Sequence, residues 1–357
     1  MTLVVSDHDA GHDPGGEVWV GVMTPGTELP TRAERIRETL VEAGAALCPA
    51  EPHPDETLSR VHDPEMLEWL AVAWAEWQQS GLRQDPGQDR VVPYLFPHPG
   101  FTGGLPLRIP RSVAARAGRF TYDTMTLIGP GTWQAARSAA DAALTAADLV
   151  LEGERFAYAL CRPPGHHAAR SAYGGSCYLN NAAIAAAHLQ GSTGGKVAVI
   201  DIDAHHGNGT QSIFYEDPDV LTASVHIDPG AGWFPHYLGF AGETGSGTGT
   251  GTNLNLPLEP GAADREWLEA IGRAAEWADS GGADLLVVPL GVDAAAGDPE
   301  SPLAVTTEGY AGAGGLIGEL GRPTVVVQEG GYDLDLLGPL VREFLLGLES
   351  ARLGGAA

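Results

Sequence analysis

The stretch VAVIDIDAHHGNG, residues 197–209, decides the fold because a run of apolar residues passes directly into a polar loop. In an extended chain, side chains two residues apart point the same way, so Asp201, Asp203 and His205 project to one side. Carboxylates and imidazoles are ligands that suit zinc or ferrous iron. The stretch therefore predicts a buried strand that ends in a metal site, and the alternative is a polar cap on a sheet edge.

Four other short apolar runs are similar to this strand in length. They are residues 156–160 (FAYAL), 220–227 (VLTASVHI), 284–290 (DLLVVPL) and 324–328 (TVVVQ). Helix candidates lie between them at residues 132–153, capped by Thr132 and stopped by Gly153, and at 180–191, stopped by Gly191. Buried strands that alternate with helices predict an α/β fold with a doubly wound, mostly parallel sheet flanked by helices.

An early surface helix is predicted over residues 31–44. Thr31 and Glu34 have the spacing of a capping box, and Gly44 would end the helix. Its apolar residues are expected on one face, and they are Ile36, Leu40 and Val41.

Two long segments lack clear periodicity, at about residues 7–30 and 80–115. The second is rich in proline, glycine and arginine, and long excursions of this kind are often functional.

The Gly/Thr stretch at residues 245–252 lacks the order of a phosphate-binding loop, and we interpret it as a surface loop. We expect residues 1–357 to form a single domain that carries these loops.

The composition excludes several classes of partner. The chain has 46 acidic and 20 basic residues, a net charge of −26, so nucleic acid and anionic membranes would be repelled. Neither a secretion signal nor an apolar run of membrane-spanning length is present, so we expect a cytoplasmic protein. The 3 cysteines lack metal-type spacing and are expected to be reduced thiols.

Polar clusters follow three of the other apolar runs directly. They are CRPPGHHA (161–168), GVDAAAGDP (291–299) and EGGY (329–332). The carboxyl ends of parallel strands form the edge where open α/β sheets bind ligands, so we expect all four clusters to meet in one crevice. Asp293 would then be a third metal ligand beside Asp203 and His205. Three protein ligands leave a position open, as in catalytic rather than structural metal sites.

The His166–His167 pair could supply the proton transfers that amide hydrolysis needs. Asp201 and Asn208 are available as their partners, and a carboxylate would raise the basicity of one imidazole while an amide leaves the other neutral. Which histidine meets which partner is open at this point. Tyr332 could stabilise a developing oxyanion. The alternative for the two histidines is an ordinary pair in a surface loop. The alternative for Tyr332 is an aromatic side chain that packs in the core.

These motifs, together with GGSCYLNNAA (174–183), resemble those of the histone deacetylase family. The similarity is greatest to its bacterial acetylpolyamine amidohydrolase branch, and it extends through RIP at 108, PGTW at 130, FPHYLG at 234 and AGETG at 241. It covers most of the chain. The resemblance implies an arginase/deacetylase-like domain whose sheet has about eight strands.

The resemblance also implies roles for the residues of the polar clusters. Zinc is expected on Asp203, His205 and Asp293. General acid and base roles fall to His166 and His167, with Asp201 and Asn208 as their partners and Tyr332 as the oxyanion donor. A structural potassium ion is expected near the zinc loop, and its ligands include Asp201, Asp203, His205 and Ser224.

Substrate is expected to reach the metal through a narrow channel. Phe234 matches one aromatic wall of the family's channel. Gly175 and Ser176 lie on the opposite side, where Ser176 replaces the family's usual aromatic residue. That side is therefore expected to be wider or wetter, and without a second ring there the substrate range is expected to differ from that of the family's other members.

Glu300 matches the position of a gatekeeper glutamate in polyamine-specific members of the family, and Glu17 aligns with an acidic residue of the bacterial enzymes. Met125 stands where those enzymes have a further glutamate. We expect a small cationic acetylated amine as substrate, with acetylpolyamines favoured over acetyl-lysine proteins or another acylated amine. The resemblance also implies a homodimer in which the segments at 7–30 and 80–115 narrow the entrance.

Two alternative functions fit the sequence less well. An arginase-like ureohydrolase needs a second metal ion, but Gly207 and Ala295 occupy the positions where its extra carboxylates are expected. A metal-stabilised binding module would need neither the histidine pair nor Tyr332. The sequence therefore favours a zinc-dependent amidohydrolase that removes acetyl groups from amines.

Overall fold

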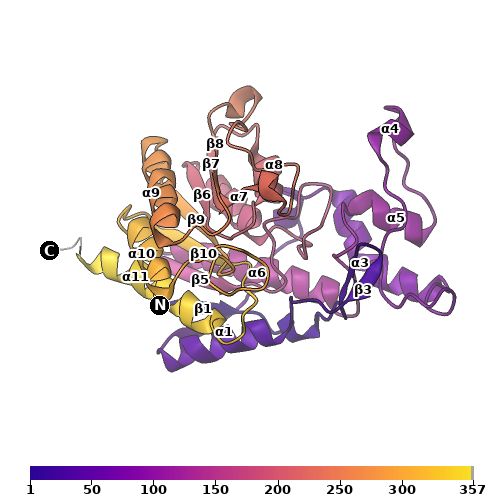
Figure 1. Ribbon diagram of the computed structural model, residues 1–357, viewed down its shortest axis with the longest axis horizontal. Helices are drawn as coiled ribbons and strands as arrows, with labels where there is room; N and C mark the ends of the chain where they lie inside the picture. Colours follow the sequence, from indigo (N-terminus) through magenta and orange to yellow (C-terminus); the bar gives the residue numbers. More distant parts are fainter. Residues whose placement is uncertain (355–357) are drawn as a thin grey trace.

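A sheet in which every neighbouring pair of strands is parallel forms the centre of the computed structural model, which describes residues 1–354 (Figure 1). Over these residues the sheet has 8 strands in the order β4-β1-β5-β10-β9-β6-β7-β8. The predicted apolar runs form five of them: β5 (Phe156–Leu160), β6 (Val197–Asp201), β7 (Val220–Ile227), β9 (Leu285–Leu290) and β10 (Thr324–Gln328). The predicted α/β fold with a parallel sheet of about eight strands is confirmed.

Three strands of this sheet were missed by the sequence analysis: β1 (Thr2–Val5), β4 (Ala46–Pro49) and β8 (Asn253–Leu258). The strands β4 and β8 form the two edges of the sheet. Edge strands are covered less completely than central ones, so they do not read as continuous apolar runs. Accordingly, most of β4 is exposed, and asparagines and a proline interrupt β8.

Helices cover both faces of the sheet. The longer ones are α1 (Thr31–Glu42), α3 (Pro64–Gln79), α5 (Val113–Phe120), α6 (Thr132–Leu151), α7 (Asn181–Thr193), α9 (Asp264–Ser280), α10 (Thr307–Gly318) and α11 (Leu337–Gly354). Shorter helices are α2 (Glu56–Ser59), α4 (Pro99–Thr102) and α8 (Asn208–Phe214). Along β5, Ala157 and Ala159 belong to the core that includes α6 and α7, whereas Tyr158 belongs to the core that includes α1, α9, α10 and α11.

The predicted helix ends need three corrections. Thr31 does not cap α1, because Pro30 precedes the helix without a side-chain cap, and Val41 is exposed rather than part of the buried face. Thr132 lies inside α6, after Gly131 in a left-handed conformation. The helix α7 continues through Gly191 and ends at Gly194, whose φ of 68° is the left-handed conformation that ends a helix.

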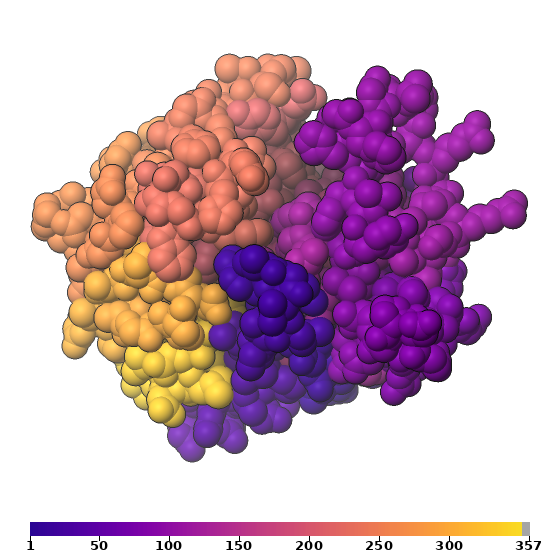
Figure 2. Space-filling model, turned by 45° about the vertical axis from the view of Figure 1, so that its right-hand side comes forward, coloured from indigo at the N-terminus to yellow at the C-terminus, as the bar shows by residue number. Residues whose placement is uncertain are grey.

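The two long excursions both carry structure of their own. Residues 7–30 contain an antiparallel hairpin of β2 (Glu17–Trp19) and β3 (Val22–Thr24). Residues 80–115 carry the short helix α4 on an arm that projects from the body in Figure 1. In Figure 2 the indigo N-terminal segment lies between the purple segment and the orange to yellow C-terminal part. Over the described residues, none of the helices has the length and apolar character that crossing a membrane requires.

Candidate active site

The four polar clusters meet at one edge of the sheet. They follow β5, β10, β9 and β6, which are consecutive in the strand order, and all four strands run in parallel. The carboxyl ends of these strands therefore place the clusters side by side.

Asp203, His205 and Asp293 lie together in this crevice, and their ligand atoms are all within 4.8 Å of one another. The Nδ1 atom of His205 is 3.0 Å from Oδ2 of Asp293 and 3.4 Å from Oδ1 of Asp203. Backbone amides hold both carboxylates, because Ala204 donates to Asp293 and Gly330 donates to Asp203, each over 2.8 Å. One nitrogen and two carboxylate groups thus converge on a single point.

The electrostatics of this triad favour a cation. Both carboxylates are buried, and burial together with the charge of Asp203 raises the pKa of Asp293 to about 7. Burial alone would lower the pKa of His205, but its hydrogen bonds to Asp203 and Asp293 outweigh burial and raise this pKa well above the usual value. Two buried carboxylates this close repel each other unless a positive charge lies between them. A bound divalent ion would supply that charge.

Glycine is required where the loop after β10 passes the triad. A Cβ atom on Gly330 would lie 2.4 Å from Oδ2 of Asp293 and 2.6 Å from Oδ2 of Asp203. The next residue, Gly331, has a φ of 121°, which side chains rarely permit. The double glycine in EGGY therefore lets the backbone pass close to the candidate metal ligands.

The two histidines have different partners. The Nδ1 atom of His166 is 3.0 Å from Oδ2 of Asp201, and Nδ1 of His167 is 2.7 Å from Oδ1 of Asn208. Burial lowers the pKa of His166, but Asp203 and Asp201 outweigh it and raise this pKa to about 10. Burial and the neighbouring His166 lower the pKa of His167 well below its usual value. At neutral pH, without a metal ion, His166 is charged and His167 is neutral.

Glu329 and Asp298 position the site, and the sequence analysis missed both. The Oε2 atom of Glu329 accepts hydrogen bonds from the amides of Gly165 and His166, at 2.6 and 3.1 Å. Oδ2 of Asp298 accepts a bond of 2.7 Å from the amide of Tyr332. Both acids belong to motifs quoted above, Glu329 to EGGY and Asp298 to GVDAAAGDP. The sequence therefore predicted that they lie at the same edge of the sheet, but it did not predict their hydrogen bonds.

Tyr332 lies beside the triad on the loop after β10. Burial raises the pKa of its phenol well above the usual value, so the hydroxyl stays protonated and can donate a hydrogen bond. The guanidinium of Arg32 lies 4.7 Å from the centre of the Tyr332 ring. Arg32 also donates to the carbonyls of Gly331 and Glu329, at 2.6 and 2.7 Å. This arginine, which the sequence analysis did not identify, holds the loop that carries Tyr332.

Arg32 belongs to a buried group of charges. Its Nη1 atom donates to Glu28 over 3.0 Å, and Arg162 contacts the same carboxylate at 2.8 Å. Burial would raise the pKa of Glu28, but Arg162 and Arg32 outweigh burial and lower it. Arg162 is the second residue of CRPPGHHA, so the group joins the histidine loop to the loop of Tyr332.

The candidate channel residues surround His167. The ring of Phe234 is 4.8 Å from the His167 ring in an edge-on arrangement, and a Cβ atom on Gly175 would lie 2.5 Å from His167. Ser176 is half-buried with a φ of 62°. The ring that faces Phe234 belongs to Tyr122, at 6.4 Å and an interplanar angle of 19°. Tyr122, which is distant from position 176 in the sequence, thus supplies a second ring opposite Phe234. The sequence analysis did not predict this ring, because it considered only position 176 for that wall.

Glu17 and Glu300 form a pair of acids near the N-terminal hairpin. The carboxylate of Glu300 accepts a hydrogen bond of 2.8 Å from Thr27. Burial and the charge of Glu300 raise the pKa of Glu17 to about 7. The fold therefore brings two acidic residues that are distant in the sequence near each other.

Comparisons with known proteins identify the family of the chain. Residues 27–348 match the family model for the histone deacetylase domain. The chain is 39% identical to the acetylpolyamine amidohydrolase of Mycoplana ramosa over 98% of this chain and 99% of the relative, and equally similar to acetylpolyamine amidohydrolase 1 of Pseudomonas aeruginosa. The crystal structure of acetylpolyamine aminohydrolase from Burkholderia pseudomallei superposes with a TM-score of 0.91, at 38% identity, over 98% of this chain and 99% of that one.

The chain belongs to the histone deacetylase family. It is a hydrolase of that family, similar over nearly its full length to the acetylpolyamine amidohydrolases.

Proposed function

We propose that this protein is a zinc-dependent amidohydrolase that removes the acetyl group from small cationic amines, with acetylpolyamines as the favoured class. The observation that carries the proposal is the convergence of Asp203, His205 and Asp293 beside two histidines with different partners. One nitrogen and two carboxylates suit zinc, and three protein ligands leave a position open. When bound, zinc would supply Lewis acidity and lower the pKa of a water molecule.

The two histidines divide the proton transfers in this proposal. His167 is neutral, so it can accept the proton of the attacking water. The Nδ1 atom of His166 is hydrogen-bonded to the carboxylate of Asp201, which favours the charged form of His166, so His166 can stabilise negative charge and donate a proton to the departing amine. The phenol of Tyr332 donates to the oxygen of the scissile carbonyl as that oxygen becomes negative.

Zinc content tests the metal assignment. We expect one zinc ion per chain by elemental analysis, loss of activity with a chelator, and recovery with zinc. A two-metal ureohydrolase would instead retain two ions. Gly207 and Ala295, at the positions of the extra ligands, argue against it.

A potassium ion near the zinc loop is a second proposed cofactor. Ser224 in β7 is the register partner of Asp201, the last residue of β6, so it lies beside the start of the candidate metal loop, and its hydroxyl group is 2.8 Å from Nδ1 of His226. Asp201, Asp203 and His205 are further residues among the proposed potassium ligands. A dependence of thermal stability on potassium rather than sodium would support this site.

The acidic pair supports a cationic substrate. The charge of Glu300 raises the cost of ionising Glu17, and an ammonium group beside the two acids would relieve that cost. The decisive measurement is kcat/KM for acetylputrescine or acetylspermidine against an acetyl-lysine peptide, in the wild type and in Glu300→Leu. We expect the wild type to prefer the polyamine and the variant to lose that preference. A preference of the wild type for the peptide would instead support an acetyl-lysine deacetylase.

We also propose a cytoplasmic homodimer. Both excursions, at 7–30 and 80–115, carry exposed apolar residues, including Val20, Val22, Phe101 and Leu105. Apolar surface that is contiguous over a large area marks interaction sites, and these residues are the proposed contacts with a second copy of the chain. Light scattering at micromolar concentration should give twice the mass of the chain, and a monomer would contradict the proposal.

A further inference from the structure

A cavity of about 610 Å³ opens beside the proposed channel. It shares Phe234 and Tyr122 with the channel, and it also reaches Asn208, the partner of His167. This volume lies within the range of small-molecule pockets, which runs from roughly 300 to 1,000 Å³. It is far more space than an acetamide needs.

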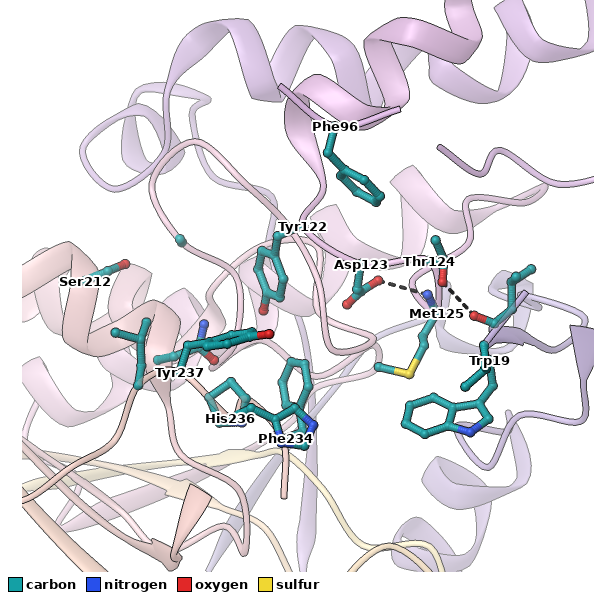
Figure 3. A pocket seen from close by; sticks show the side chains of 16 residues that line it. Trp19, Phe96, Tyr122, Asp123, Thr124, Met125, Ser212, Phe234, His236 and Tyr237 are labelled. Atoms are coloured by element: carbon teal, nitrogen blue, oxygen red, sulfur yellow. Dashed lines mark hydrogen bonds between the residues drawn. The ribbon is translucent and has the colours of Figure 1, made fainter. Parts of the chain in front are cut away.

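The lining of this entrance cavity is mainly apolar and aromatic. Figure 3 shows Phe96 on one side, Phe234, His236 and Tyr237 on the opposite side, and Met125 with Trp19 on a third. Ligand pockets typically combine such walls with few polar groups.

The one carboxylate in the lining is not free to bind a cation. Oδ1 of Asp123 accepts from the amides of Met125 and Thr126, and Oδ2 accepts from the amide of Gly175 over 2.6 Å. Oδ2 also accepts from the hydroxyl group of Thr126. Asp123 therefore shapes the loop. Glu17 lies outside the lining, although its hairpin neighbours Val18 and Trp19 are part of it.

Backbone strain also concentrates here. Over the described residues, three residues other than glycine have a positive φ, and two of them line the cavity: Val20, at 50°, and His236, at 61°. The third is Ser176 on the channel side. Residues held in such conformations cluster at ligand sites.

We infer that the entrance cavity binds an apolar group, aromatic or branched aliphatic, carried by the acetylated amine beyond its charged nitrogen. The substrate is then amphipathic. Its ammonium group is the proposed partner of Glu17 and Glu300, since the hairpin neighbours Val18 and Trp19 of Glu17 line the cavity, and its apolar end lies between Phe96 and Phe234. The inference rests on the proposed function and narrows its substrate class from simple polyamines to amines that carry an uncharged apolar substituent.

The test compares N-acetylputrescine with N-acetyl-N′-benzylputrescine, which keeps the positive charge and adds one aromatic ring. Burial of a phenyl group on apolar walls is expected to raise kcat/KM about tenfold. Phe96→Ala removes one wall, and Met125→Glu places a charge in the lining. Both variants should reduce the tenfold ratio to about threefold or less. Phe240→Ala is the matched control, because Phe240 is exposed and lies outside the lining, and it should leave the ratio unchanged.

Each outcome has a separate meaning. If the wild-type kcat/KM for the benzylated compound does not exceed that for N-acetylputrescine, the inference is overturned. This result is expected if a second copy of the chain fills the cavity. A tenfold ratio that survives in both Phe96→Ala and Met125→Glu also overturns it. In these cases hydrolysis of N-acetylputrescine leaves the proposed function standing. If neither compound is hydrolysed by zinc-loaded protein, the polyamine assignment itself fails.

Discussion

Tyr332 is the side chain whose loss tests the proposed chemistry most directly. Burial keeps its phenol protonated, and Asp298 and Arg32 hold it in place. Removal of one oxyanion donor typically lowers turnover by about 10²- to 10³-fold. We expect a loss of this size in Tyr332→Phe, with zinc content unchanged. Tyr94→Phe, which alters an exposed tyrosine, should keep full activity. Normal turnover in Tyr332→Phe would refute the assignment.

Ionisation of Glu17 is expected to destabilise the folded protein as pH rises, whereas ionisation of most acidic side chains stabilises it. Burial and the charge of Glu300 raise the pKa of Glu17 from the ordinary value of 4.5 to about 7, so the native state binds a proton more tightly than the unfolded state does. The free energy of unfolding therefore falls as pH rises from about 4.5 through 7. Glu17→Gln removes this cost, so its Tm should exceed that of the wild type at pH 8 and match it at pH 4. An equal Tm at pH 8 would exclude the raised pKa.

The same titration should be visible in substrate binding. Above pH 7 the ionised Glu17 attracts an ammonium group, so KM for acetylputrescine should fall as pH rises through 7. The KM of uncharged N-acetylbutylamine should not follow this change, which separates binding of the charge from titration of the catalytic residues.

Buried charges join three elements of the fold: the helix α1, the histidine loop after β5 and the loop after β10. The charged residues are Glu28, Arg32 and Arg162. Removal of one partner leaves the other charges buried and uncompensated, which typically costs 3–5 kcal/mol. We expect Glu28→Gln to lower the free energy of unfolding by about 3 kcal/mol or more in urea titrations. Glu34→Gln, on the exposed side of α1, should have little effect. Equal stabilities of the two variants would contradict this role.

The net charge of −26 gives the whole molecule a negative field that favours cationic substrates. Salt screens this field, because the Debye length falls from about 30 Å at 0.01 M to about 3 Å at 1 M. We expect kcat/KM for acetylputrescine to fall about tenfold between low and high ionic strength. Neutral N-acetylbutylamine is the control, and an equal salt dependence of both compounds would show that the field does not act on the substrate.

Much of the fold was determined by the sequence alone, because the signals are local. The apolar run at 197–201 and its four counterparts are buried on both faces, so they read as strands without further information. The edge strands β4 and β8 lack this signal, and their pairing depends on neighbours far along the chain. The residues of the site were also visible, since parallel strands bring their carboxyl ends to one edge.

Only the tertiary structure decided which groups meet. It pairs His166 with Asp201 and His167 with Asn208, and it places Glu329 under the histidine loop. It also brings Tyr122 opposite Phe234 and leaves an apolar cavity beside them. These contacts join residues that are distant in the chain, and no local periodicity encodes them. The sequence therefore determined the chemistry available at the sheet edge, and packing determined its geometry and the shape of the entrance.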